Sequence, residues 1–516
     1  MNKELVSYRP LMIYAFCVPV AVFIGYMLTN PMNYSTLGIF GILALLLISP
    51  LLLRWHYPLL ILSQQVGMAL FFIKGQPSLG VLMTAVSFGI SLLERAMNRN
   101  RQFIRVPEIT WPLLCIGAVV LFTASLTGGI GMQALGSDVY GGKKYVFLIL
   151  GIMLYFALTA QRIPPERARL YVALYFVGAL LSFISDLYPL APHWAMPVFW
   201  FFTPNTISIS PYGLGETRLG GFCSTGVALF CLLMAYYGIR GILVLDKPWR
   251  LILFILSIML VFLGGYRGQL FVIGVTFIFM FFLEKLHRTK LLPILMVVGV
   301  AGFMVLIPYA SKLPFTFQRT LAFLPLHLDN MARESARDTL NWRLDMWKAL
   351  LPQVPQHLLL GKGLAISRED FQLKLGEDAP LANAAAFDPT QDPLAISYDY
   401  HNGPLSILIP FGIWGAITFM WLMVVGVQVL YANCRYCDPS LKTINLYLFA
   451  SFLTILVSFL FVGGSLSGDL MRFTCILGLS VAINGGKCKP VPQLIPETVE
   501  SGIPRQLPRL LPVFER

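Results

Sequence analysis

Apolar stretches of about 16 to 25 residues recur along almost the whole chain, and each is long enough to cross a membrane as an α-helix. A β-barrel would show short alternating segments instead. Only 12% of the residues are charged, about half the share found in a soluble domain. The sequence therefore predicts an all-α, polytopic helical membrane protein with about 12 to 14 transmembrane helices.

The positions of the expected spans follow from apolar length alone. They lie near residues 11–29, 37–53, 57–73, 79–93, 111–128, 144–160, 170–187, 219–239, 249–263, 269–284, 290–309, 404–431, 446–463 and 470–485. We expect the first to be a retained helix, because no small-residue cleavage site follows it.

Five short basic loops set the expected orientation, since cytoplasmic loops carry an excess of lysine and arginine. They are 95–105, 162–169, 240–250, 284–290 and 433–442. When all five are placed in the cytoplasm, an even number of spans separates each loop from the next. Both termini are then expected to be cytoplasmic. The net charge of +13 is attributed to such loops, so no nucleic-acid partner is expected.

This layout divides the chain into four regions. Residues 1–309 form an N-terminal transmembrane region, and residues 310–402 form one large extracytoplasmic loop. Residues 403–486 supply the C-terminal transmembrane helices, and residues 487–516 form a proline-rich tail that we expect to be disordered and cytoplasmic. Because the loop is too long to be a mere connection, we expect it to be functional.

Two arginines fall on the outer side, against the positive-inside rule. Arg218 ends "GLGETR" at the mouth of a span, and Arg267 lies in the tight turn of "LGGYRGQL". A guanidinium near hydrocarbon usually faces a polar cavity and a partner. The alternative is an interfacial anchor whose side chain extends to the lipid headgroups.

The large loop supplies two more arginines. Residues 334–353, "ESARDTLNWRLDMWKALLPQ", predict an amphipathic helix that carries Arg337 and Arg343. Its apolar stripe consists of Leu340, Leu344, Trp347 and Leu351. A helix that lies on the lipid headgroups is an equally good interpretation. We expect Arg218, Arg267 and Arg343 to converge on one outer cavity, because guanidinium groups match phosphate oxygens.

His401 stands immediately before the predicted helix of "HNGPLSILIPFGIWG". Asn402 or Gly403 can cap this helix, and its positive end would attract an anion. The same field favours the neutral imidazole, which can accept a proton. His401 is therefore a candidate general base, with a merely hydrogen-bonding histidine as the alternative. Asp399 and Tyr400 are candidate supporting residues, although neighbours in an extended segment point apart.

Two kinds of site are not expected. The sequence has no glycine loop followed by Lys-Ser or Lys-Thr and no zinc-type histidine pair. We therefore expect neither a bound cofactor nor a metal.

The order and spacing of five short motifs resemble the O-antigen ligase superfamily over roughly residues 210–430. The motifs are "RLGGF", "GGYRGQL", "NWRLDMW", "LLLGKGLA" and "HNGPLSILIPFGIWG". The family includes O-antigen ligases, some O-antigen polymerases, protein O-oligosaccharyltransferases and inorganic-carbon transporter-like proteins.

The resemblance implies a membrane-embedded glycosyltransferase of the bacterial inner membrane. Such an enzyme moves a glycan from undecaprenyl diphosphate to an acceptor hydroxyl, with no nucleotide sugar and no required metal. The acceptor can be lipid A core, a protein or another surface molecule. Carried over to this sequence, Arg218, Arg267 and Arg343 would hold the diphosphate and His401 would act on the acceptor.

The sequence also leaves other functions open. An O-antigen or exopolysaccharide polymerase would share the basic outer face. A small-anion transporter of the bicarbonate type, or a carrier-lipid flippase, represents another class. The spans are poor in ionisable residues, which counts against a transport path.

The topology yields a direct prediction. Cysteines introduced near positions 330 and 375 should react with a thiol reagent that cannot cross the membrane, because the loop 310–402 is expected to be extracytoplasmic. Protection of both positions in intact cells would contradict this orientation.

Overall fold

The computed structural model describes residues 34–73, 75–98, 102–131, 140–204, 207–208, 216–217, 219–367 and 393–490, with a few isolated residues between 18 and 29. Side chains of residues 34–38, 40 and 42–46 are not described. Arg218, most of the acidic part of the large loop and the chain beyond residue 490 lie outside the described residues.

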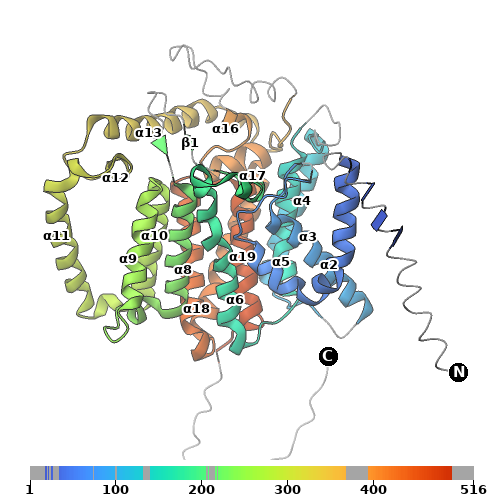
Figure 1. Ribbon diagram of the computed structural model, residues 1–516, viewed down its shortest axis with the longest axis horizontal. Coiled ribbons are helices and arrows are strands. Elements are labelled where there is room, and N and C mark those ends of the chain that lie inside the picture. The colour runs from blue at the N-terminus through green and yellow to red at the C-terminus, as the bar shows by residue number, and fades with distance from the viewer. Residues whose placement is uncertain are drawn as a thin grey trace, which may run out of the picture.

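The protein is a polytopic helical membrane protein, as predicted (Figure 1). Among the described residues, nine helical segments are long and apolar enough to cross a membrane, and three shorter apolar helices accompany them. The principal helices are α2 (Tyr34–Ser63), α3 (Leu79–Met97), α4 (Pro107–Thr127), α5 (Gly142–Thr159), α6 (Pro165–Leu180), α8 (Gly220–Ile242), α9 (Trp249–Leu263), α10 (Arg267–Leu283), α11 (Leu291–Tyr309), α17 (Gly403–Tyr436), α18 (Lys442–Phe461) and α19 (Leu466–Asn484).

Shorter elements connect these helices. They are η2 (Leu181–Leu190), η3 (His193–Ala195), α7 (Val198–Phe201), η4 (Leu286–Arg288), η5 (Ala310–Lys312), α12 (Phe315–Thr320), α13 (Asn330–Leu350), α14 (Gln353–Gln356), α16 (Pro393–Ile396) and η7 (Pro439–Leu441). The described strands are β1 (Ile207–Ser208) and β2 (Glu216–Thr217), a minimal antiparallel pair.

The two spans expected near 37–53 and 57–73 differ from the structure. A single helix, α2, covers Tyr34–Ser63 and contains both Pro50 and Pro58. Within this helix His56 is buried, and its Nδ1 atom lies 2.9 Å from the Ser87 hydroxyl oxygen. Residues 64–73 and 75–78 then continue without helix.

The core is centred on α19, which packs against α5, α17 and α18. In contrast, α11 stands at the edge of the molecule (Figure 1) and has no buried residue. Its two ends hold it in place: Leu291 and Leu295 contact the main core, whereas Phe303 and Leu306 contact a small cluster around Leu321.

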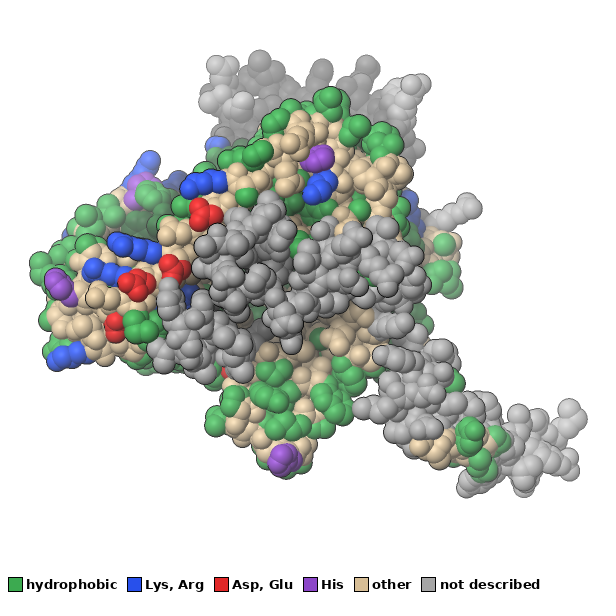
Figure 2. All heavy atoms as spheres, turned by 90° about the horizontal axis from the view of Figure 1, so that it is seen from above, with side chains coloured by type: hydrophobic (Ala, Val, Ile, Leu, Met, Phe, Trp, Pro, Cys, Tyr) green, Lys and Arg blue, Asp and Glu red, His purple; other side chains and the backbone are tan. Residues whose placement is uncertain are grey.

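The helix predicted within the large loop is confirmed as α13, which lies across one end of the bundle (Figure 1). Its buried residues are Ala332, Ala336, Met346 and Leu350. The leucines of the apolar stripe, Leu340, Leu344 and Leu351, are exposed instead. Figure 2 shows charged side chains of both signs on the exposed face in this part of the molecule.

The helix α17 is broken at Gly412, which has a φ of 62° and follows Pro410 by two residues. The segment 358–363 lies against this break and replaces the missing helical hydrogen bonds. The N–H of Ile413 donates to the Leu358 carbonyl at 2.7 Å, that of Lys362 to the Ile409 carbonyl at 2.8 Å, and that of Gly363 to the Pro410 carbonyl at 2.9 Å. Such bonds satisfy backbone groups that a broken transmembrane helix would otherwise leave unpaired.

Gly361 is a position in this segment that requires glycine. Its φ is +75°, and a Cβ placed there would lie 2.2 Å from the Pro410 carbonyl oxygen. We expect Gly361→Ala to lower the free energy of unfolding by about 1–3 kcal/mol, because backbone strain and a clash add. Thermal unfolding of the purified protein in detergent measures this loss.

The matched control is Gly302→Ala in α11, where nothing lies within 4 Å of the added Cβ. It should leave the thermal midpoint unchanged or slightly raised. Equal thermal midpoints for the two variants would contradict a structural role for Gly361.

Candidate functional site

His401 lies at the entry to α17, where the backbone turns sharply. Its φ is 47°, in the left-handed region. Asn402 caps the helix, because its side-chain oxygen accepts a hydrogen bond from the Leu405 N–H at 3.1 Å. Pro404 lies in the first turn. The predicted helix start is therefore confirmed, and the imidazole lies next to the positive end of the helix.

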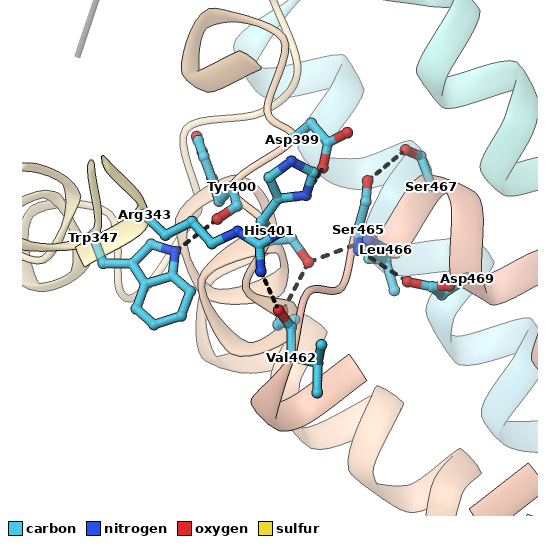
Figure 3. A network of polar contacts seen from close by, with 12 residues as sticks. Arg343, Trp347, Asp399, Tyr400, His401, Val462, Ser465, Leu466, Ser467 and Asp469 are labelled. Carbon is cyan, nitrogen blue, oxygen red and sulfur yellow. Dashed lines mark hydrogen bonds and ion pairs between the residues drawn. The ribbon is translucent and has the colours of Figure 1, made fainter. Parts of the chain in front are cut away.

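Asp399 is close to His401. The chain is not extended there, because Tyr398 and His401 both have positive φ values. One carboxylate oxygen of Asp399 lies 3.6 Å from Nδ1 of the half-exposed imidazole (Figure 3). This is an ion-pair distance rather than a hydrogen bond. The ring also meets Trp342 edge to face, with centroids 5.8 Å apart.

Tyr400 supports the site through its backbone. Its side chain is only 1% exposed, and its carbonyl accepts a hydrogen bond from Trp347 Nε1 of α13 at 2.8 Å. Burial raises the pKa of the Tyr400 phenol, followed by the influence of Tyr398, so this group stays protonated. Tyr400 therefore joins α13 to the segment that precedes His401.

Arg343 extends from α13 beneath the imidazole in the view of Figure 3. Its guanidinium donates to the carbonyl of Val462, at the end of α18, at 3.0 Å. The Nε atom is buried and has no hydrogen-bond partner. Burial lowers the pKa of Arg343 from its usual high value, yet arginine remains charged at neutral pH. This side chain therefore retains capacity to bind an anion.

The remaining arginines have different surroundings. Arg267, at the start of α10, donates to the Ala336 carbonyl of α13 at 3.0 Å. Arg337 is exposed on α13. Arg218 lies outside the described residues, so the expected convergence of three arginines stays a prediction.

A cavity of about 480 Å³ begins beside Arg343 and His401 and extends between the helices. Gly268 and Gln269, next to Arg267 in the chain, also line it. Its lining also includes polar or titratable side chains of several helices and of the segment after α2: Gln65, Tyr175, Ser224, Cys231, Thr276, Tyr447, Ser451, Thr454 and Ser458. A cavity with apolar walls and a few convergent polar groups is the usual form of a substrate site.

Two further charged residues line this cavity, although the sequence analysis did not select them. Arg472 and Asp469 of α19 form an ion pair at 3.2 Å. Asp469 also accepts a hydrogen bond from the Ser465 N–H at 3.0 Å, which fixes the start of α19 (Figure 3). In the sequence, the feature that could have indicated these two residues is a pair of opposite charges three residues apart at the beginning of an apolar stretch.

No group of three or more histidine, cysteine or acidic side chains in the described parts of the chain is arranged to hold a metal ion.

Comparison with known proteins identifies the class. Residues 252–420 match the model of a family described as O-antigen ligase. This match confirms the resemblance to the O-antigen ligase superfamily and includes Arg267, Arg337, Arg343 and the segment 399–402. A search of curated proteins finds no match.

The chain thus carries an O-antigen ligase domain within a multi-pass membrane protein of polysaccharide biosynthesis. In general terms, its function is of the ligase or polymerase type. Asp469 and Arg472 lie outside the matched residues.

Proposed function

We propose that this protein is a glycosyltransferase that moves a glycan from undecaprenyl diphosphate to an acceptor hydroxyl. The reaction would take place on the outer face of the bacterial inner membrane, with both chain termini in the cytoplasm. The observation that carries the proposal is the meeting of Arg343 and His401 at one cavity within a chain that matches the O-antigen ligase family.

In this mechanism Arg343 binds the diphosphate. Its guanidinium lines the cavity and uses one nitrogen for the Val462 carbonyl, so other N–H groups remain for phosphate oxygens. Charge on the diphosphate grows as the bond to the anomeric carbon breaks, and a fixed cation stabilises that charge. Arg218, Arg267 and Arg337 are proposed as further donor-binding residues, of which Arg267 lies beside the cavity lining.

His401 takes the proton of the acceptor hydroxyl while the acceptor oxygen attacks the anomeric carbon. The new carbon–oxygen bond forms as the bond to the diphosphate breaks, and the diphosphate leaves with the bonding electrons. Asp399 lies nearest to Nδ1 of His401, so we assign proton transfer to Nε2. The carboxylate would stabilise the imidazolium that forms. Asn402 holds the histidine at the helix start.

A polymerase is the second candidate, because it would use the same donor chemistry with a lipid-linked acceptor. Transport of a small anion is less well supported. Arg343, His401, Asp469 and Arg472 are the basic and acidic side chains among the described lining residues, and they lie on α13, just before α17 and near the start of α19. A transport path would need such groups along its length.

The assay uses the purified protein, a lipid-diphosphate glycan and candidate lipid and protein acceptors, with the products identified by mass. A glycan on a non-carrier acceptor indicates ligation, and a longer carrier-linked glycan indicates polymerisation. If neither product forms with any acceptor while the donor is bound, transfer is contradicted.

His401→Ala should reduce transfer by a factor of about 10² to 10⁴, which is the usual contribution of a general base. Protein level and donor binding should stay nearly intact. His401→Gln is the sharper variant, because glutamine keeps hydrogen bonding but cannot accept a proton at neutral pH. Arg343→Gln should weaken donor binding as well as turnover.

The matched control for the arginine is Arg435→Gln, at the opposite end of α17. It should leave donor binding and turnover unchanged. Near-normal transfer by His401→Gln would assign His401 to positioning rather than proton transfer.

A further inference from the structure

A second hollow lies away from the candidate site, on the surface between α4 and α17. It has a volume of about 380 Å³. Its lining is apolar apart from one threonine and consists of Ala118, Val119, Phe122, Thr123, Leu359, Leu360, Phe411 and Trp414. Leu359 and Leu360 belong to the segment 358–363 that lies against the break in α17.

The two leucines are exposed although the backbone on either side of them is fixed. Leu359 is 69% exposed and Leu360 is 59% exposed. The Leu358 carbonyl and the Lys362 N–H are both hydrogen-bonded to α17, so these side chains cannot turn inward without breaking such bonds. Exposed leucines held beside an apolar groove require an apolar neighbour.

The length of α17 indicates what that neighbour is. Beyond the break at Gly412, the part of α17 from Ile413 to Tyr436 would span about 36 Å at 1.5 Å per residue, whereas the hydrocarbon core is about 30 Å thick. About 20 residues are needed to cross, so counting back from the basic end at Arg435 places the other boundary close to Trp414. Tryptophan is enriched at this depth. The groove therefore lies at the headgroup boundary of the leaflet on the His401 side.

A cation lies next to the groove at this boundary. Lys362 is exposed and follows Leu360 by two residues. It takes part in no ion pair among the described residues. His357 precedes the leucines, and its pKa is lowered by burial and then by the charge of Lys362, which is consistent with their proximity. An apolar groove beside a lysine that has no ion-pair partner among the described residues complements a lipid with a negative headgroup.

We propose that this groove binds an anionic phospholipid from the leaflet on the His401 side. One acyl chain would lie between α4 and α17 against Leu359 and Leu360, and the phosphate would lie beside Lys362. Such a lipid would cover the segment 358–363. That segment continues to Ala365, whose carbonyl accepts a hydrogen bond from the Tyr398 hydroxyl at 2.6 Å, three residues before His401.

Site-specific photo-crosslinking tests the proposal independently of glycan transfer. The full chain with Leu360→p-azidophenylalanine is reconstituted in nanodiscs that contain equal amounts of phosphatidylglycerol and phosphatidylcholine, and the lipid adducts are identified by mass. One lysine near a headgroup gives a preference of about fivefold for the anionic lipid. Adding Lys362→Gln should bring the ratio of adducts close to one.

Two controls fix the location. Adding Lys348→Gln, an exposed lysine on α13, should leave the fivefold ratio unchanged. A probe at Leu121, which is 60% exposed on α4 but outside the groove lining, should label both lipids equally. Three results would each overturn the proposal. The first is equal labelling of the two lipids at Leu360 while Lys362 is present, and the second is a preference for the anionic lipid that survives Lys362→Gln. The third is adducts with protein instead of lipid.

Discussion

The hydrogen bond from the Arg343 guanidinium to the Val462 carbonyl, at 3.0 Å, is the contact on which the candidate site depends. It joins α13, which belongs to the large loop, to the end of a transmembrane helix. Charged hydrogen bonds of this kind contribute about 1.5–3 kcal/mol each. Two further contacts attach α13 to the rest of the protein: Arg267 to the Ala336 carbonyl and Trp347 to the Tyr400 carbonyl. The loop helix is thereby fixed over the cavity.

The second constraint is the position at which α17 begins. Asn402 caps the helix, and the segment 358–363 holds its broken third turn through three backbone hydrogen bonds. His401 is therefore attached to a rigid helix start rather than to a free loop. In the proposed mechanism this rigidity matters, because a general base must stay within hydrogen-bonding reach of the acceptor hydroxyl.

Apolar length was sufficient to predict most of the membrane-spanning helices. The expected spans at 249–263 and 290–309, for example, differ from α9 and α11 by at most one residue at either end. The two spans expected near 37–53 and 57–73 were wrong, because α2 continues through residues 54–56, where buried His56 contacts Ser87 of α3. Local pattern cannot reveal such a tertiary partner.

The candidate site was only partly predictable for the same reason. His401 and Asn402 could be selected because a helix start has a local signature. Asp399 approaches His401 in a segment whose positive φ values, at Tyr398 and His401, occur at residues without a glycine signal. Asp469 and Arg472 reach the cavity only because α19 packs at the centre of the bundle, which their own segment does not encode.

The central claim is that Arg343 and His401 act on one substrate in one cavity. Electron cryo-microscopy of the full chain with bound undecaprenyl diphosphate tests it most directly. The account predicts phosphate oxygens within hydrogen-bonding distance of the Arg343 guanidinium, with the terminal phosphate facing His401. A diphosphate bound outside this cavity, with no contact to Arg343, would contradict the account.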